Sequence, residues 1–127
     1  MSKWFDESEF VCKCCGQLPP KGIDQNLLDL LDDIREAVDT PLTVNCGYRC
    51  AQHNAQVGGV PDSQHNGNPC TAADIDATDI GVEELAQFAE IAGADGVGRY
   101  FGEAGTFCHI DVRSGRIGDT FRWTEGV

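Results

Sequence analysis

Two stretches of the chain place apolar residues at helical spacing, with charged residues on the opposite face. The first begins after Asp24, a favourable N-cap, and Pro41 stops it, so we expect a helix between these two residues. The second helix is expected to begin at Thr78 or Asp79, and a short helix is expected over residues 52–57. The apolar stripes comprise Leu27, Leu28, Leu31, Ile34 and Val38 in the first helix, and Val82, Leu85, Phe88 and Ala89 in the second.

Short apolar or alternating runs between and after these helices predict β-strands. The runs are "PLTVNC" (41–46), "AADID" (72–76), "GVGRY" (96–100), "TFCHIDVR" (106–113) and, as an edge strand, "GDTFRW" (118–123). The third and fourth runs flank the turn sequence "FGEAG", which favours an antiparallel hairpin. Residues 1–22 contain adjacent prolines and several cysteines, and we expect them to be irregular. The order of elements predicts one α+β domain over residues 1–127, with two main helices packed on a small, mainly antiparallel sheet.

The composition narrows the classes of protein to which the chain can belong. With 127 residues, of which 41% are hydrophobic, the chain can bury a core as one soluble domain. It contains no apolar run long enough to cross a membrane, and its opening "MSKWFDESEF" lacks the pattern of a secretory signal. The net charge of −12 would repel phosphates, so we expect neither nucleic acid nor an anionic membrane as partner. We also expect a monomer.

Seven cysteines are many for a chain of this length, and their odd number leaves at least one outside any intrachain disulfide. The sequence "CKCC" at residues 12–15 resembles one half of a zinc knuckle, but no second CxxC or CxxH pair follows nearby. Three interpretations stay open: disulfides formed in an oxidising compartment, a small structural metal site, and reduced, buried thiols.

The histidines offer a candidate metal site. His65 lies in a polar loop, Asp74 lies in the strand that follows, and His109 lies in a later strand. Strand alternation places His109 and Asp111 on one face of that strand. Two imidazoles and one carboxylate can form the protein ligands of a catalytic zinc ion, which lowers the pKa of a bound water to about 7 and polarises a carbonyl. The alternative is a set of unrelated surface polar residues, and His53 is expected to be one of these.

The stretch "GYRCAQHNAQVGGVPDSQHNGNPCTAADID" resembles the core of the zinc D-Ala-D-Ala carboxypeptidase and L-alanyl-D-glutamate endopeptidase family, murein peptidases that share a metal site with the Hedgehog signalling domain. The family pattern S-x-H-x-x-G-x-A-x-D is matched by Ser63, His65, Ala72 and Asp74, and a later H-x-D is matched at His109. The opening "FDESEFVCKCCG" resembles that of the small, single-domain branch. The resemblance covers residues 5–113 and implies a Hedgehog-like fold.

The resemblance also implies roles for individual residues. The Zn²⁺ ligands would be His65, Asp74 and His109. Arg49 would face the substrate, holding a carboxylate or a developing oxyanion, and its alternative role is a structural salt bridge. Ser63 and Tyr48, the tyrosine of "GYR", would support the site or contact the substrate. Ser63 has no paired base, so we expect it to donate or accept hydrogen bonds and not to act as a nucleophile.

The chain departs from the family pattern at three positions. The spacer from His65 to Asp74 is longer than in the family, and Cys70 stands where the family glycine would fall. Thr106 occupies the position at which many active members carry the general base, which leaves Glu103 and Asp111 as candidate catalytic carboxylates. Phe107 replaces the first histidine of an H-x-H strand. Asp111, together with Asp76, is also a candidate hydrogen-bond partner for a metal-bound imidazole.

The longer spacer leads to a hypothesis about the cysteines. Relative to the family, Cys46 and Cys70 replace small residues in segments that flank the expected site. We therefore expect a disulfide between these two cysteines to hold the longer loop in place.

The function that the resemblance implies is a zinc metallopeptidase that cleaves stem peptides of bacterial peptidoglycan, as a D,D-carboxypeptidase or an endopeptidase. Without a signal or a wall-binding repeat, such an enzyme could be phage-encoded and reach the cell wall after release. The alternative is a zinc-stabilised binding or structural module of the same fold with weak or no turnover. A third possibility is a cysteine-rich interaction domain without a metal.

Overall fold

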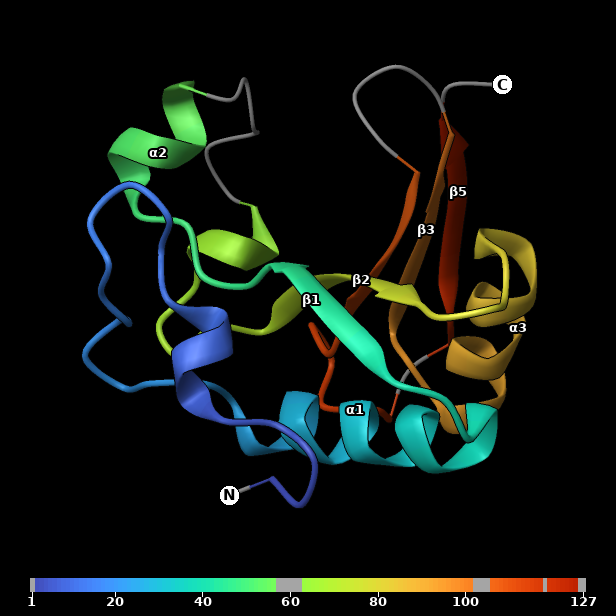
Figure 1. Cartoon of the computed structure of the whole chain (residues 1–127). Coiled ribbons are helices and arrows are strands. Elements are labelled where there is room, and N and C mark those ends of the chain that lie inside the picture. The colour runs from blue at the N-terminus through green and yellow to red at the C-terminus, as the bar shows by residue number, and fades with distance from the viewer. Residues whose placement is uncertain (1, 57–62, 102–105, 118, 126–127) are drawn as a thin grey trace.

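A computed structural model describes residues 2–56, 63–101, 106–117 and 119–125. Its elements are η1 (Glu7–Phe10), α1 (Gln25–Val38), β1 (Leu42–Cys46), α2 (Ala51–Gln56), η2 (Gln64–Asn66), β2 (Ala72–Ala77), α3 (Val82–Ala92), β3 (Gly96–Tyr100), β4 (Phe107–Asp111) and β5 (Phe121–Glu125), where η denotes a 3-10 helix (Figure 1). Among these residues, no helix has both the length and the apolar character that a membrane span requires.

The five strands form one sheet in the order β1-β2-β4-β3-β5. All neighbouring pairs are antiparallel except β3 and β5, which run parallel at one edge. The structure therefore confirms the expected α+β class and the mainly antiparallel sheet. It also confirms the hairpin of β3 and β4, although β4 pairs with β2 on its other side, so that a late strand lies at the centre of the sheet.

Helix α1 forms where its apolar stripe predicts. The Asp24 side chain accepts a hydrogen bond from the Asn26 backbone, and Asp39 ends the helix in the left-handed conformation. The stripe is wider than expected because Leu30 is fully buried as well. Four buried leucines and Ile34 thus give α1 a broad face that packs on the sheet.

Helix α3 begins later than the sequence pattern predicted. Thr78 donates its backbone N–H to the Pro41 carbonyl, and Asp79 adopts a left-handed turn conformation, so neither starts the helix. The N-cap is Gly81, which lacks a side-chain cap, and Phe88 is only half-buried whereas Ala86 is fully buried. The chain after β2 bonds to the Pro41 backbone, and no local sequence pattern predicts this contact. The contact outweighs the preference of Thr78 and Asp79 for the N-cap position.

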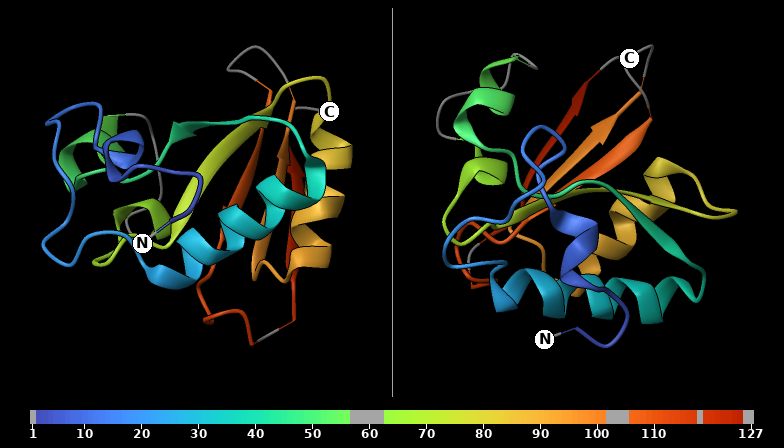
Figure 2. Two further views of the ribbon diagram at one scale, coloured as in Figure 1. Left: turned by 60° about the horizontal axis from the view of Figure 1, so that its bottom comes forward. Right: turned by 60° about the vertical axis from the view of Figure 1, so that its left-hand side comes forward.

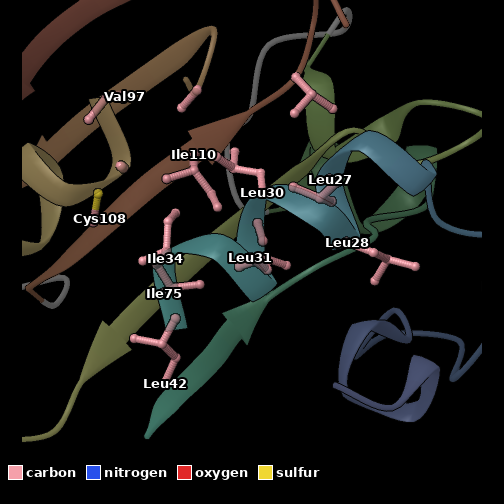
Figure 3. Packing of buried hydrophobic residues seen from close by; sticks show 14 of the residues in the cluster. Leu27, Leu28, Leu30, Leu31, Ile34, Leu42, Ile75, Val97, Cys108 and Ile110 are labelled. Atoms are coloured by element: carbon pink, nitrogen blue, oxygen red, sulfur yellow. The ribbon is translucent and has the colours of Figure 1, made fainter. Parts of the chain in front are cut away.

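The hydrophobic core lies between the sheet and the two long helices, which both cover the same face (Figure 2). Figure 3 shows Leu30 and Leu31 of α1 lying near Ile110 of β4 and Ile75 of β2. Val97 of β3 and Cys108 of β4 extend the same layer toward α3. Since side chains alternate along a strand, the residues next to these in sequence point to the opposite face, which carries the polar residues.

The N-terminal segment is more ordered than expected. Residues 7–10 form a 3-10 turn whose Asp6 and Glu9 make a reciprocal capping box, and Phe10 is fully buried. Phe10 lies against Gly47 so closely that a Cβ on Gly47 would stand 2.7 Å from the Phe10 Cα. Only glycine fits there, and the close approach fixes the N-terminal segment against the loop after β1.

Candidate metal centre

Three atoms that could donate an electron pair to a metal ion converge on the polar face of the sheet; we call them the three donors. His65 is supplied by η2, Asp74 by β2 and His109 by β4, and the register of β2 and β4 places Asp74 directly opposite His109. His65 Nε2 lies 3.2 Å from Asp74 Oδ1 and 3.2 Å from His109 Nδ1, and the latter two atoms are 3.0 Å apart. The structure thus brings together all three residues that the sequence singled out as metal ligands.

The outer nitrogen of each imidazole has its own hydrogen-bond acceptor. His65 Nδ1 lies 2.8 Å from the Gly47 carbonyl oxygen, and His109 Nε2 lies 2.9 Å from Asp111 Oδ2. Both nitrogens must donate to these acceptors, so in the neutral rings the facing nitrogens, His65 Nε2 and His109 Nδ1, carry lone pairs. Two lone pairs and a carboxylate oxygen then face one another, an arrangement that a shared proton or a metal ion would stabilise.

The electrostatics of the centre favour positive charge. Burial lowers the pKa of the His65 imidazole, but its contacts with Asp74 and Cys46 and the charge of Asp74 together outweigh burial, and the pKa is raised. For His109, burial is likewise outweighed by the bonds to Asp111 and Asp74, and its pKa is raised too. Burial raises the pKa of Asp74, yet the two histidines bring it well below its usual range. The centre attracts a proton or a metal ion into the same space.

The spacing of the three donors fits a metal ion. In a tetrahedral site with metal–nitrogen and metal–oxygen distances of about 2.0–2.1 Å, neighbouring ligand atoms are about 3.3–3.4 Å apart. The distances of 3.0–3.2 Å observed among the three donors require an outward shift of only a few tenths of an ångström. Three protein ligands leave a fourth position for water or substrate, as in catalytic metal sites.

Asp111 holds His109 in place and is itself held by Arg113. The Asp111 side chain is fully buried, and Arg113 Nε and Nη2 bind its two oxygens at 2.8 and 2.6 Å. Gly96 on β3 lies opposite Asp111, and any side chain there would collide with the carboxylate. Asp111 therefore orients an imidazole, one of the two roles expected for it, whereas Asp76 bonds to Asn45 on β1.

Cys46 brings a sulfur close to the centre. It pairs with Asp74 across β1 and β2, and its Sγ, a nitrogen of His65 and an oxygen of Asp74 all lie within 4.8 Å of one another. Its Sγ is 3.9 Å from His65 Nδ1, the nitrogen that donates to the Gly47 carbonyl. Cys46 thus lies on the side of the ring away from His109, and the sequence pattern did not mark it as a candidate ligand.

Ser63 connects Arg49 with His65. The Ser63 hydroxyl accepts hydrogen bonds from the His65 backbone and from Arg49 Nη2, and the Arg49 backbone donates to the His65 carbonyl. Arg49 forms no ion pair with a described residue, so the structural salt bridge considered above finds no support there. Its Nε is buried and has no hydrogen-bond partner among the described residues. A buried, unpaired guanidinium donor beside the centre is suited to an anionic ligand.

The longer loop between His65 and Asp74 is held by backbone hydrogen bonds, and the expected disulfide is absent. Cys46 and Cys70 are both thiols in the part of the chain that the structure describes. The Cys70 backbone pairs with the chain before α1, donating to Gly22 and accepting from Asp24. Cys70 is fully buried, and burial raises the pKa of its thiol to about 12. The longer loop is thus tied to the chain before α1, while His65 and Asp74 lie 3.2 Å apart at their nearest side-chain atoms.

The other residues singled out by the sequence fall into two groups. Glu103, the first candidate for the general base, lies outside the described residues. Tyr48 donates its backbone N–H to Phe10, and its ring packs partly against the core, which fits a supporting role. Thr106 is exposed at the start of the strand that carries His109.

An aromatic group beside His109 was missed in the sequence. The ring of Trp123 on β5 lies 5.1 Å from the His109 ring, and its Nε1 donates to the Tyr100 hydroxyl at 2.8 Å. Trp123 stands opposite Gly98 of β3, where a Cβ would meet the indole at 2.5 Å. The alternation of glycines in "GVGRY" was the available signal, because glycine within a strand often marks a close approach by another group.

The segment that contains these residues matches a known protein family. The family model described as Peptidase M15 matches residues 3–111, a range that contains all three converging residues and Arg49. No curated protein matches the chain at a significant level.

We expect Asp111→Asn to weaken binding of a divalent metal about 10- to 100-fold, because the amide no longer holds the His109 ring as a carboxylate does. Competition with a chromophoric chelator measures the affinity, and circular dichroism verifies that the variant is folded. The matched control is Asp76→Asn, which changes a carboxylate on the same sheet that contacts Asn45, and it should bind metal as the wild type does. Equal affinities of the two variants would contradict the orienting role of Asp111.

Proposed function

Because the chain belongs to the peptidase M15 family, as its motifs predicted, we propose that it is a zinc-dependent peptidase acting on bacterial peptidoglycan. The reaction is hydrolysis of a peptide bond in the stem peptides, of the D,D-carboxypeptidase or endopeptidase type. The observation that supports the proposal most strongly is the convergence of the His65, His109 and Asp74 donors with their lone pairs facing one another.

The donor set favours zinc among the divalent metals. Two imidazoles and a carboxylate are typical ligands of catalytic zinc, whereas magnesium and calcium prefer oxygen ligands. A bound zinc ion supplies Lewis acidity, which lowers the pKa of a coordinated water and polarises a carbonyl. The protein holds both rings in the required orientation through the Gly47 carbonyl and Asp111, so little reorganisation is needed when substrate binds.

Arg49 is proposed to bind the substrate. Ser63 holds one nitrogen of its guanidinium, the backbone of Arg49 is fixed to His65, and Nε is left to donate to a substrate oxygen. A planar guanidinium can hold a carboxylate through two parallel hydrogen bonds, and stem peptides end in such a group. Because Ser63 bonds to both Arg49 and the His65 backbone, a substrate bound to Arg49 would be held at a fixed position relative to the three donors.

Glu103 is proposed as the general base. Both oxygens of Asp111 are already engaged by His109 and Arg113, so Asp111 is poorly placed to accept a further proton. Glu103 lies in the sequence between β3 and β4, six residues before His109. A carboxylate there could take the proton from the attacking water.

Metal removal tests the proposed activity directly. Purified peptidoglycan incubated with the zinc-loaded protein should release peptide fragments that mass spectrometry identifies, and the fragments reveal which bond is cut. Chelator treatment should abolish release, and added zinc should restore it. Asp74→Asn should lose activity and zinc together, whereas Asp79→Asn, an exchange in a turn, should keep both. If the zinc-loaded wild type releases nothing, the chain is a binding or structural module.

Arg49→Lys should lower kcat/KM about 10- to 100-fold, because a point charge replaces two charge-assisted hydrogen bonds worth about 1.5–3 kcal/mol. Kinetics on a soluble stem peptide measure the loss, and zinc content should stay unchanged. The control is Arg122→Lys on β5, where the arginine pairs with Glu90 of α3. Unchanged kinetics in Arg49→Lys would show that Arg49 does not bind the substrate.

Glu103→Gln should lower kcat about 10²- to 10⁴-fold if Glu103 is the base, since the amide cannot accept the proton. The KM for the same peptide and the zinc content should change little. Glu83→Gln removes a carboxylate on α3 that bonds to Arg99 on the helix side of the sheet, and it should retain full activity. Equal rates for the wild type and Glu103→Gln would exclude Glu103 as the base.

A further inference from the structure

The segment after η1 forms a compact loop that contains Cys12, Cys14 and Cys15. Cys12 donates its backbone N–H to the Gln17 carbonyl, and its own carbonyl accepts from Gly16, so residues 12–17 are closed by two hydrogen bonds. Gly16 adopts a left-handed conformation with φ of +70°. A C-x-x-C sequence followed by a glycine turn directs both sulfurs to the same side, as in one half of a zinc knuckle.

The other half of such a site comes from a distant part of the sequence. Cys50, which follows Arg49, brings its sulfur so close that the Sγ atoms of Cys12, Cys15 and Cys50 all lie within 4.8 Å of one another. The backbone N–H of Cys50 also points at Cys12 Sγ, at 3.4 Å. A backbone donor aimed at a sulfur stabilises its thiolate form, which is the form that binds metals.

A fourth thiol is adjacent to these three. Cys14 belongs to the same loop, and burial together with the nearby Cys50 thiol raises the pKa of the Cys14 thiol. Cys12 is fully buried, Cys50 is half-buried, and Cys14 and Cys15 lie toward solvent. Four cysteines from two segments therefore gather at one place on the surface.

We propose that Cys12, Cys15 and Cys50, with Cys14 as the fourth ligand, hold a structural zinc ion that is separate from the centre at His65. Sulfur atoms of a tetrahedral zinc site lie about 3.8 Å apart, and the observed cluster requires only small movements to reach that spacing. Four thiolates fill the coordination sphere and leave no position for substrate. Each thiol releases its proton to solvent on binding, so no other reactant is needed.

The proposed ion would fix the loop that carries Arg49. That loop is already held on one side by the hydrogen bond from Tyr48 to Phe10 and on the other by the bond from Arg49 to His65. A metal bridge from Cys50 to the N-terminal segment would add a third attachment, next to Arg49 in sequence. The second site would thus position a substrate-binding residue without contacting substrate.

A disulfide accounts less well for the same cluster. A disulfide joins two sulfurs and leaves the others as thiols, whereas three sulfurs here all lie within 4.8 Å of one another. The backbone donor aimed at Cys12 also favours a thiolate over a neutral disulfide sulfur. The chemistry of the cluster therefore points to a soft divalent cation with a preference for sulfur.

Metal content of variants tests the proposal independently of the peptidase activity. The wild type, purified under reducing conditions without chelator, should contain two zinc ions per chain by elemental mass spectrometry. Cys50→Ser and His65→Ala should each retain one, and Cys108→Ala, which removes a core thiol, should retain two. If only the thiol site is wrong, the wild type contains one ion, which His65→Ala loses. If only the His65 centre is wrong, His65→Ala keeps one ion and Cys50→Ser loses it.

Two further measurements do not depend on whether Cys50→Ser folds. Cobalt added to His65→Ala should produce the intense charge-transfer absorption of a thiolate-bound ion. In the native, zinc-loaded wild type, a thiol reagent should modify Cys12, Cys14, Cys15 and Cys50 slowly, and a chelator should accelerate the modification. Absence of the cobalt band, rapid modification that the chelator leaves unchanged, or an intact mass that reveals a disulfide between these cysteines would overturn the proposal.

Discussion

The antiparallel register between β2 and β4 is the constraint around which the candidate centre is built. It sets Asp74 opposite His109, and the chain before β2 then carries His65 over the same pair. Because the outer nitrogens of both rings are already committed to Gly47 and Asp111, only the facing nitrogens can take up a further proton or a metal ion. A carboxylate buried beside two imidazoles needs a compensating positive charge, so the charge state of the centre and the stability of this face are coupled.

The two faces of the sheet have different roles: one packs the hydrophobic core, and the other carries the candidate centre. Apolar residues of β2, β3 and β4 point to α1 and α3 and supply the core. On the opposite face, glycines at 96 and 98 leave room for the Asp111 carboxylate and for the indole of Trp123. The strict alternation of side chains along each strand lets five residues of β4 serve both tasks at once.

Local sequence patterns predicted the helices and strands, and they failed where contacts between distant segments determine the structure. The stripe of α1, its cap at Asp24 and the alternation around His109 follow from short-range periodicity, and all three were predictable. The start of α3, the hydrogen-bonded anchoring of the loop at Cys70 and the approach of Cys50 to residues 12–15 depend on contacts between residues far apart in the chain. The sequence pattern marked Cys12, Cys14 and Cys15, but spacing alone could not reveal that Cys50 lies beside them. Glu103 lies outside the described residues, and its part in the site stays a prediction.

The position of β4 has a consequence for how the molecule is assembled. This strand is the fourth to be synthesised, yet it lies between β2 and β3, and it brings the last of the three donors. A nascent chain that ends before β4 has neither a continuous sheet nor a complete ligand set, however well its helices have formed. The pairing of β4 with β2 joins residues distant in sequence, which makes it slower to form than the β3–β4 hairpin. A ribosome must therefore synthesise the chain through His109 before the three residues of the centre can meet.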